Sequence, residues 1–275
     1  MIEVVDPGLL TTVQDRGRPG LAHLGVPPSG AADSRALALG NVLVGNPPDA
    51  AVLEATLVGP RLRFDLPTLV ALTGACEPQV LETRELEPVA CDGGARLYVA
   101  VRGGVEVAPV LGSRSTDLLT GLGPPPLRAG DVLAVGPEPM RPAPRAEATR
   151  APVERVLRVI PGPREDWFTP GALGLLCEAE WRVTPSSNRV GVRLDGPELV
   201  WARSDELRSE GLVTGALQVP SAGRPILLLN DHPTTGGYPV IAVVHSDDLP
   251  HAGQLRPGDT VRFTAGCRSG RTGQP

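Results

Sequence analysis

The two halves of the chain carry similar short motifs in the same order, and this repetition constrains the fold more than any other feature of the sequence. Each match is short, but several matches in one order are typical of an internal duplication. We therefore expect two similar domains in tandem. The matched pairs are residues 57–64 with 194–201, 73–75 with 214–216, 103–104 with 236–237, and 127–131 with 255–259.

Short apolar runs bounded by glycine and proline fill both halves. Runs of this kind predict β-strands, and the 33 glycines and 31 prolines among 275 residues supply turns between them. The sequence therefore predicts an all-β chain with a few short helices. The expected strands are residues 61–64, 69–72, 96–101, 132–135, 155–160, 181–184, 190–194, 217–219, 225–229, 240–244 and 260–263.

Helical spacing of apolar residues occurs in two places. The first runs from Asp33 to Val44, where Asp33 or Ser34 can cap the helix and Gly45 can end it. The second opens at residues 169–170, a threonine that can cap and a first-turn proline. Both segments are short, so the helices are expected to cover the sheets and not to form a core of their own.

A segment without periodicity separates the halves. Residues 137–152 are rich in Pro, Ala, Arg and Glu, a composition typical of linkers. We expect an N-terminal half over residues 1–136 and a C-terminal half over residues 153–265. Residues 266–275 are polar and are expected to form a flexible tail.

The chain contains no lysine, since all 26 of its basic residues are arginines. A phosphate-binding Walker A loop needs a lysine on the phosphates, and Schiff-base chemistry needs a lysine amine. Biotin is likewise attached to a lysine amine. The sequence thus excludes all three from this chain, and any biotin in the system would sit on another protein.

Charge, hydropathy and cysteine patterns exclude further classes. The formal net charge is −5 without a basic face, so we expect no nucleic-acid partner. The apolar runs are too short to span a membrane and the first residues contain no signal-peptide core, so a cytoplasmic protein is expected. The four cysteines and four histidines form neither a CxxC nor an HExxH pattern, so no metal site is expected from them.

A polar loop between two apolar runs is the best candidate site. Residues 231–239 (Asp-His-Pro-Thr-Thr-Gly-Gly-Tyr-Pro) join the strands expected at 225–229 and 240–244. Adjacent glycines let backbone N–H groups converge on an anion, and polar loops on rigid strands often carry function. A hairpin with a long turn is the plain structural alternative. A second polar stretch, residues 209–211 followed by 214–220, lies within loop reach.

Two polar turns in the first half are further candidates for anion binding. Residues 113–117 (Ser-Arg-Ser-Thr-Asp) are five consecutive polar side chains, which predict either a capped turn or a cluster aimed at an anion. Asp15, Arg16 and Arg18 lie among the turn signals that fill the N-terminal segment. For these three, a solvated charged turn is the favoured interpretation and an anion-facing group is the alternative.

Together these stretches resemble a known family, the C subunits of bacterial 5-oxoprolinase, also called allophanate hydrolase subunit 2 or the biotin-dependent carboxyltransferase family. The resemblance covers most of the chain in order. The sequence departs from the family pattern at His232, Pro233 and Val240, where arginine, glutamine and lysine are usual. The matching runs are residues 13–20, 29–33, 43–46, 53–54, 111–117, 161–164, 188–193, 209–211, 215–220 and 234–239.

The resemblance implies two tandem cyclophilin-like β-barrel domains, in agreement with the duplication. It also implies an enzyme shared with two partners, one similar to the B subunit of 5-oxoprolinase, with a related fold, and one similar to its A subunit, with a different fold. Together such proteins hydrolyse 5-oxo-L-proline to L-glutamate with ATP, expected with Mg²⁺. A lactam is a poor electrophile, so the reaction needs an anchor for the substrate carboxylate, stabilisation of phosphoryl charge and a positioned water.

The resemblance gives the polar residues of the candidate loops their expected roles. Arg16 and Arg114 would hold anions, since arginine binds carboxylates and phosphates in a bidentate manner. Asp231 would act as a base or metal-side carboxylate, with Gln218 and Tyr238 as the orienting members of the catalytic set. The substrate- and phosphate-binding set is completed by Ser113, Ser115, Ser209, Glu210, Thr234, Thr235, Gly236 and Gly237.

Two other functions fit the same residues. One is a carboxyltransferase module of a urea carboxylase-type system, which the missing lysine disfavours because biotin would have to be carried elsewhere. The other is regulatory, since some relatives bind a partner that inhibits a sensor kinase. The sequence does not separate a component of a lactam hydrolase from such a regulatory protein.

Overall fold

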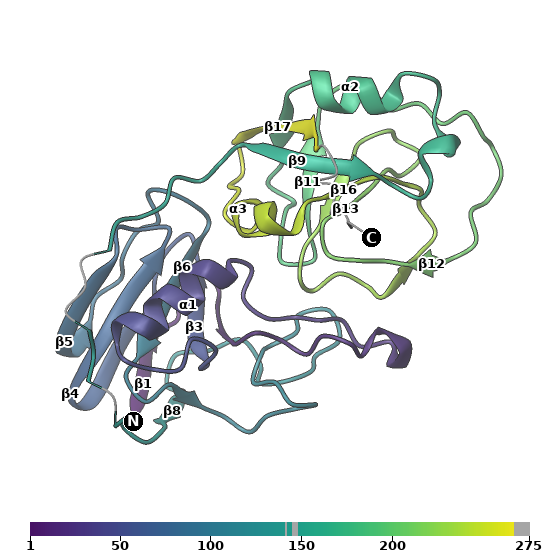
Figure 1. Ribbon diagram of the computed structural model, residues 1–275. Coiled ribbons are helices and arrows are strands. Elements are labelled where there is room, and N and C mark those ends of the chain that lie inside the picture. Colours follow the sequence, from purple (N-terminus) through teal and green to yellow (C-terminus); the bar gives the residue numbers. More distant parts are fainter. Residues whose placement is uncertain (141, 145–147, 267–275) are drawn as a thin grey trace, which may run out of the picture.

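The computed structural model describes residues 1–140, 142–144 and 148–266, and within these residues no helix is long and apolar enough to cross a membrane. Each half of the chain forms its own sheet, and the two halves lie next to one another (Figure 1). The predicted all-β class, with two tandem barrel-like sheets and a few short helices, is confirmed. The predicted linker lies partly, and the predicted tail almost wholly, outside the described residues.

The first half is an eight-stranded sheet in which neighbouring strands are antiparallel. Its order is β2-β3-β6-β4-β1-β8-β7, with β5 paired to β4 outside this path. The structure has one long strand, β4, where the sequence predicted two short ones, and it has two strands in the N-terminal segment, where the sequence predicted none. The bounds are β1 (Ile2–Asp6), β2 (Thr11–Gln14), β3 (Val52–Thr56), β4 (Arg61–Gly74), β5 (Gln79–Leu86), β6 (Arg96–Val101), β7 (Val105–Glu106) and β8 (Val132–Val135).

An irregular segment after β7 closes the first sheet. The backbone N–H of Thr116 donates to Val13 O (2.9 Å), and the N–H of Leu127 donates to Thr11 O (2.9 Å). The Gln14 amide adds a bond to the carbonyl of Thr116 (3.0 Å). These bonds cover the free edge of β2, which would otherwise expose unpaired backbone groups, and β2 is accordingly buried along its whole length.

The second half is a closed barrel with the order β10-β11-β14-β13-β16-β9-β17. All its pairs are antiparallel except β17 with β9, which is parallel. Strands β14 and β16 flank β13 and do not pair with each other, so the loop at 231–239 is not the turn of a hairpin. The bounds are β9 (Val156–Pro161), β10 (Trp181–Val183), β11 (Gly191–Asp195), β12 (Glu210–Gly211), β13 (Ala216–Gln218), β14 (Ile226–Leu228), β15 (Thr235–Gly236), β16 (Val240–Val244) and β17 (Thr260–Ala265).

One of the repeated motifs has the same conformation in both halves. Before β8, the N–H of Arg128 donates to the Asp131 carboxylate at 2.7 Å, and before β17 the N–H of Arg256 donates to the Asp259 carboxylate at 2.9 Å. In each case the aspartate N–H returns a bond to the arginine carbonyl. The fourth matched pair is therefore one turn used twice, each time leading into the last strand of a half.

The two predicted helices differ in how well their starts were placed. Helix α1 (Ser34–Leu43) is capped as predicted, because the Asp33 carboxylate accepts from two amides of the first turn (3.1 and 3.0 Å). Helix α2 (Ala172–Glu178) begins later than predicted. The reason is that Thr169 is held in an extended segment: its N–H and hydroxyl both donate to Val200 O, so the hydroxyl does not cap the helix.

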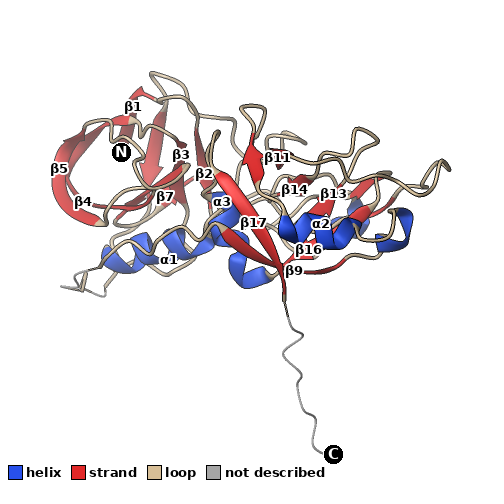
Figure 2. Cartoon of the chain, turned by 90° about the horizontal axis from the view of Figure 1, so that it is seen from above, coloured by secondary structure: helices blue, strands red, loops and turns tan. Residues whose placement is uncertain are grey.

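Helix α1 and a short helical pair in the second half meet where the halves join. The pair consists of η3 (Ser246–Asp248) and α3 (Leu249–Gly253). The guanidinium of Arg35 donates to Asp247 O at 2.6 Å. Helix α3 approaches the segment before α1 so closely that a side chain added at Gly253 would lie 2.4 Å from the carbonyl oxygen of Ala32. Figure 2 shows α1 and α3 as neighbours on one face of the molecule.

Candidate functional site

The two polar stretches of the second half are brought together as a two-stranded ribbon. Strand β15 pairs with β12, with Thr235 opposite Gly211 and Gly236 opposite Glu210. The N–H of Leu212 extends the pairing to Thr234 O (2.9 Å). The predicted Ser209, Glu210, Thr234, Thr235, Gly236 and Gly237 thus lie in one surface feature, which we call the β12–β15 ribbon (residues 209–212 and 234–237).

Gln218 and Tyr238 lie at the base of this ribbon. The Gln218 amide donates to Tyr238 O at 3.2 Å, and the Tyr238 side chain is exposed. A side chain at Gly236 would lie only 2.8 Å from the Gln218 amide nitrogen, so a larger residue there would displace the Gln218 side chain. The structure therefore places the predicted orienting residues beside the predicted loop, with Gln218 buried and Tyr238 open to solvent.

An arginine that the sequence analysis gave no role neutralises the acid of the ribbon. Arg164 donates from Nε to one Glu210 carboxylate oxygen at 2.9 Å and from Nη2 to the other. The bond from Arg164 lowers the pKa of Glu210, and the bond from Glu210 raises the pKa of Arg164. Arg164 belongs to a run that resembles the family, so a charged residue in that run was the available signal.

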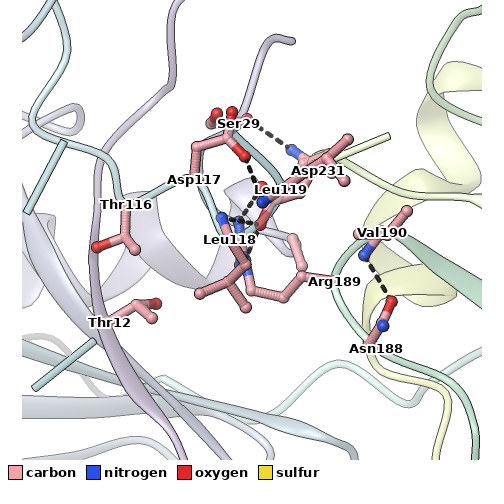
Figure 3. Close-up of polar contacts among 12 residues, drawn as sticks. Thr12, Ser29, Thr116, Asp117, Leu118, Leu119, Asn188, Arg189, Val190 and Asp231 are labelled. Carbon is pink, nitrogen blue, oxygen red and sulfur yellow. Dashed lines mark hydrogen bonds and ion pairs between the residues drawn. The ribbon is translucent and has the colours of Figure 1, made fainter. Parts of the chain in front are cut away.

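Asp231 does not lie open to a substrate. It is fully buried, and Arg189 binds it in a bidentate manner at 2.9 and 3.1 Å (Figure 3). The N–H of Leu118, from the first half, donates a third bond at 3.3 Å. The expected role of Asp231 as a base or metal-side carboxylate is therefore not supported by its position, which is that of a contact between the halves.

The same arginine reaches into the first half. Arg189 donates to the Glu54 carboxylate and, at 2.7 Å, to Gly30 O. Glu54 also accepts from the Tyr98 hydroxyl (2.9 Å), and the Arg96 guanidinium lies 3.7 Å away. Burial by itself would raise the pKa of Glu54, but Arg189 and Arg96 outweigh it and hold that pKa below its ordinary value.

These four buried charges, Glu54, Arg96, Arg189 and Asp231, were missed as a group in the sequence, and we call them the buried charge cluster. Two cations face two carboxylates, as buried charges require. A signal was present, because Glu54 is an acid within an otherwise apolar strand, where charged residues are rarely buried without a partner.

In the first half, the predicted anion cluster surrounds an anion of the chain itself. The Asp15 carboxylate accepts bonds from Ser113 Oγ, Ser115 Oγ and the N–H of Arg114, all at 2.6 Å, and from the N–H of Gly17 at 2.8 Å. Both serines are buried. Of the two interpretations of this run, the capped turn is the one the structure shows.

The three arginines near this turn lie in different environments. The guanidinium of Arg114 forms an exposed ion pair with Glu106 at 2.6 Å. Arg18 is only 2% exposed and donates to Ser29 Oγ (2.9 Å) and Ser115 O (2.5 Å), so the expected solvated turn is wrong for this residue. Arg16 is exposed and, among the residues that the structure describes, has no hydrogen bond or ion pair.

Arg16 lines a cleft of about 520 Å³ between the two halves, which we call the inter-half cleft. The first half contributes the arm around Arg16 and one side of α1, and the second half contributes Thr214, Asn230 and the η3–α3 pair. The volume falls within the roughly 300–1,000 Å³ range of small-molecule sites. Of the predicted anion-binding residues, the structure places only Arg16 here.

Comparison with known proteins identifies the family. The family model described as carboxyltransferase domain, subdomain A and B, matches residues 24–265. The chain is 36% identical to the C subunit of 5-oxoprolinase from Escherichia coli, over 96% of this chain and 90% of that protein. It is 34% identical to urea amidolyase of Lachancea kluyveri, over 95% of this chain but 17% of that protein.

Solved structures give the same result. The crystal structure of TTHA0988 matches with a TM-score of 0.85 at 37% identity, over 96% of this chain and 55% of that one. The Kluyveromyces lactis urea amidolyase matches with a TM-score of 0.86 at 32% identity, over 96% of this chain and 18% of that one. The chain thus spans about half of TTHA0988 and less than a fifth of the amidolyases. With a family model over most of its length and relatives over nearly all of it, this chain belongs to the carboxyltransferase domain family, subdomain A and B.

Proposed function

We propose that this chain is the C subunit of an ATP-dependent 5-oxoprolinase, which opens the lactam of 5-oxo-L-proline to L-glutamate with two partners similar to the A and B subunits of that enzyme. One observation carries the proposal: the chain and the C subunit of E. coli 5-oxoprolinase align over 96% and 90% of their lengths. The match to urea amidolyase covers only 17% of that protein. The proposal places the chain in the cytoplasm, where ATP is available.

The partners come from the proposed function itself, in which the rest of the enzyme is supplied by the two other proteins. This chain covers 55% of TTHA0988. The exposed β12–β15 ribbon is open on the surface of this chain and is available to a partner's substrate or nucleotide.

ATP would supply the driving force by phosphorylating the lactam oxygen, which turns a poor electrophile into a cleavable one. The hydroxyls of Thr234 and Thr235 and the amides of Gly236 and Gly237 remain our proposed donors to the phosphoryl group of the nucleotide. Within residues 1–140, 142–144 and 148–266, no three His, Cys, Asp or Glu side chains are grouped for metal binding. Mg²⁺ is commonly held by phosphates with one or two carboxylates, so we assign it to the nucleotide and to no cluster of this chain.

Reconstitution tests the proposal. The purified chain alone should release no phosphate from ATP in response to 5-oxo-L-proline, and the three proteins together should release phosphate and glutamate. Leaving out this chain should abolish the reaction. Full activity of the isolated chain, or an assembled complex that hydrolyses ATP without responding to 5-oxo-L-proline, would refute the shared-enzyme proposal. Binding to a partner without any turnover would favour the regulatory alternative.

A carboxyltransferase of the urea carboxylase type is the second candidate, favoured by the family model and by the identity to the urea amidolyases. It requires biotin on another protein, because this chain has no lysine to carry it. The discriminating measurement is carboxyl transfer from a carboxylated biotin carrier to urea in the assembled system. Transfer to urea without a response to 5-oxo-L-proline would select this candidate over the first.

A further inference from the structure

Hydrogen bonds between the halves fix the walls of the inter-half cleft. The Asn230 side-chain amide donates to Ser29 O and Ala31 O, both at 3.2 Å, and the N–H of Ser29 donates to Asn230 O at 3.0 Å. Arg189 adds its bond to Gly30 O at 2.7 Å. The walls of the cleft are therefore preformed, which lowers the ordering cost of binding.

One guanidinium in the cleft has no direct partner. Arg16 has no hydrogen bond or ion pair within the described part of the chain. Asp15 also lines the cleft, but its two carboxylate oxygens accept from Ser113, Ser115 and the N–H of Arg114, and it does not pair with Arg16. Since a guanidinium pairs best with a carboxylate or phosphate, the cleft favours an anionic ligand.

The remaining polar groups of the cleft offer both donors and acceptors. The hydroxyls of Ser34, Thr214 and Ser246 line it, and none of them has a hydrogen-bond partner in residues 1–140, 142–144 and 148–266. Both bonds of the Asn230 side chain use its nitrogen, so its oxygen is left as an acceptor. A neutral amide needs this combination, with donors to its C=O group and an acceptor for its N–H group.

The rest of the lining is apolar and suits a small saturated ring. Leu37 and Ala38 of α1 and Leu249 and Pro250 of α3 line the cleft. An apolar wall with a few convergent polar groups is typical of small-molecule sites. The three features together describe one kind of ligand, which has a carboxylate, a ring and an amide.

We propose that the inter-half cleft binds a small cyclic amide that carries a carboxylate, with Arg16 on the carboxylate, the Asn230 side-chain oxygen on the lactam N–H group and the cleft hydroxyls on the lactam carbonyl. This inference rests on the proposed function, because it identifies the cleft as the place where this chain holds 5-oxo-L-proline. Arg16 would fix the end of the ligand that does not react, so it is a binding and not a catalytic residue.

Binding to the isolated full chain tests the cleft. Titration calorimetry should detect 5-oxo-L-proline, and Arg16→Gln should weaken it by roughly tenfold or more, as expected for loss of a charged hydrogen bond. 2-Pyrrolidinone has the same ring without the carboxylate. It should bind weakly to the wild type and to Arg16→Gln, with the same affinity for both. Arg84→Gln removes an exposed arginine that does not line the cleft and should leave binding unchanged.

A steric pair on one helix gives a second test. Ala38→Phe should fill the cleft and abolish binding, whereas Val42→Phe on the exposed side of α1 should not. The inference is overturned if the folded wild-type chain does not bind 5-oxo-L-proline at millimolar concentrations, or if Arg16→Gln and Ala38→Phe both bind it as the wild type does.

The assembled enzyme separates this failure from failure of the proposed function. In an active complex of all three proteins, Arg16→Gln should raise KM for 5-oxo-L-proline by roughly tenfold with a smaller change in kcat. An active complex with an unchanged KM would place the substrate elsewhere and leave the proposed function standing. A complex inactive with 5-oxo-L-proline would refute the proposed function itself.

Discussion

His232 is a buried imidazole within the candidate loop, and it makes the folded state sensitive to acid. It is 3% exposed, and its Nδ1 lies 2.7 Å from Pro233 O, so Nδ1 carries the donated proton. Burial lowers the pKa of His232 below its ordinary value of 6.5, with the bond to Pro233 and the nearby Asp231 carboxylate opposing this shift. The folded chain therefore favours the neutral ring.

Because the pKa of His232 is lower in the folded chain, the free energy of unfolding depends on pH. Above a pH of about 6.5 the ring is neutral in both states, and the contribution of His232 to stability is fully present. As the pH falls from there toward the lower folded-state pKa, the unfolded chain takes up the proton first and the contribution is lost. His232→Gln should therefore reduce the loss of stability between about pH 7 and pH 5, measured by urea unfolding. His23→Gln alters an exposed histidine and is the matched control. An identical pH slope for His232→Gln and the wild type would contradict this prediction.

Residue types were predictable from the sequence, but their partners were not. Ser113 and Ser115 were assigned to substrate binding, with a capped turn as the alternative, and only the fold brings Asp15 against them from about a hundred residues away. Asp231 was predicted to be a catalytic carboxylate because it lies in a polar loop. In the folded chain it binds Arg189. Long-range pairing decides such partners, and a local pattern carries no information about it.

At the scale of elements, the contact between α3 and the segment before α1 allows no extra atom. Gly253 lies in α3, and a methyl group there would lie 2.4 Å from the Ala32 carbonyl, which is backbone and cannot rotate away. Gly253→Ala should thus destabilise the chain by roughly 1–3 kcal/mol, the usual cost of overpacking. Thermal and urea unfolding would measure it.

A second helical glycine provides the opposite expectation. Gly174 lies in α2, is exposed, and has no atom within 4 Å of the position its side chain would occupy. Gly174→Ala should stabilise by about 0.5–1 kcal/mol, because alanine has less backbone entropy to lose in a helix. Equal effects of the two substitutions would mean that α3 does not press against Ala32.

Elements with strong local signals were placed well, and those that depend on distant partners were not. Helix α1 begins where Asp33 caps it, a local event. The start of α2 depends on Thr169 pairing with Val200, which no local rule reveals. Strand β2 was not predicted, since its partners are β3 and a segment that follows β7, both far along the chain.

At the scale of the whole molecule, the buried charge cluster is the strongest polar connection between the halves. Arg189, from the second half, is 1% exposed at its side chain and binds Glu54 of the first half. Arg189→Met would leave Glu54 and Asp231 buried without the guanidinium that bonds to both of them. Breaking such a buried network typically costs roughly 3–5 kcal/mol. Arg61→Met removes an exposed pair with Glu87 and should cost at most about 1 kcal/mol.

The same variant should uncouple the halves, and the tryptophans make this visible. All three lie in the second half, at positions 167, 181 and 201, so their fluorescence reports only that half. In the wild type, unfolding followed by tryptophan fluorescence and by far-ultraviolet circular dichroism should coincide. In Arg189→Met the two transitions should separate. Coincident transitions with a loss below about 1 kcal/mol would show that apolar contacts alone join the halves.

The parallel pairing of β17 with β9 has a consequence for how the protein is made. On the ribosome, β9 emerges about a hundred residues before β17, yet Val156 and Arg262 are opposite one another in the finished barrel. The second half therefore stays incomplete until nearly all of the described chain has been translated, with β9 lacking one neighbour. The first half has a pairing of similar reach, since β1 pairs not only with β4 but also with β8, which begins at Val132. All its strands are nevertheless translated before β9, so its sheet can form first, with Glu54 beside Arg96, before Arg189 is added.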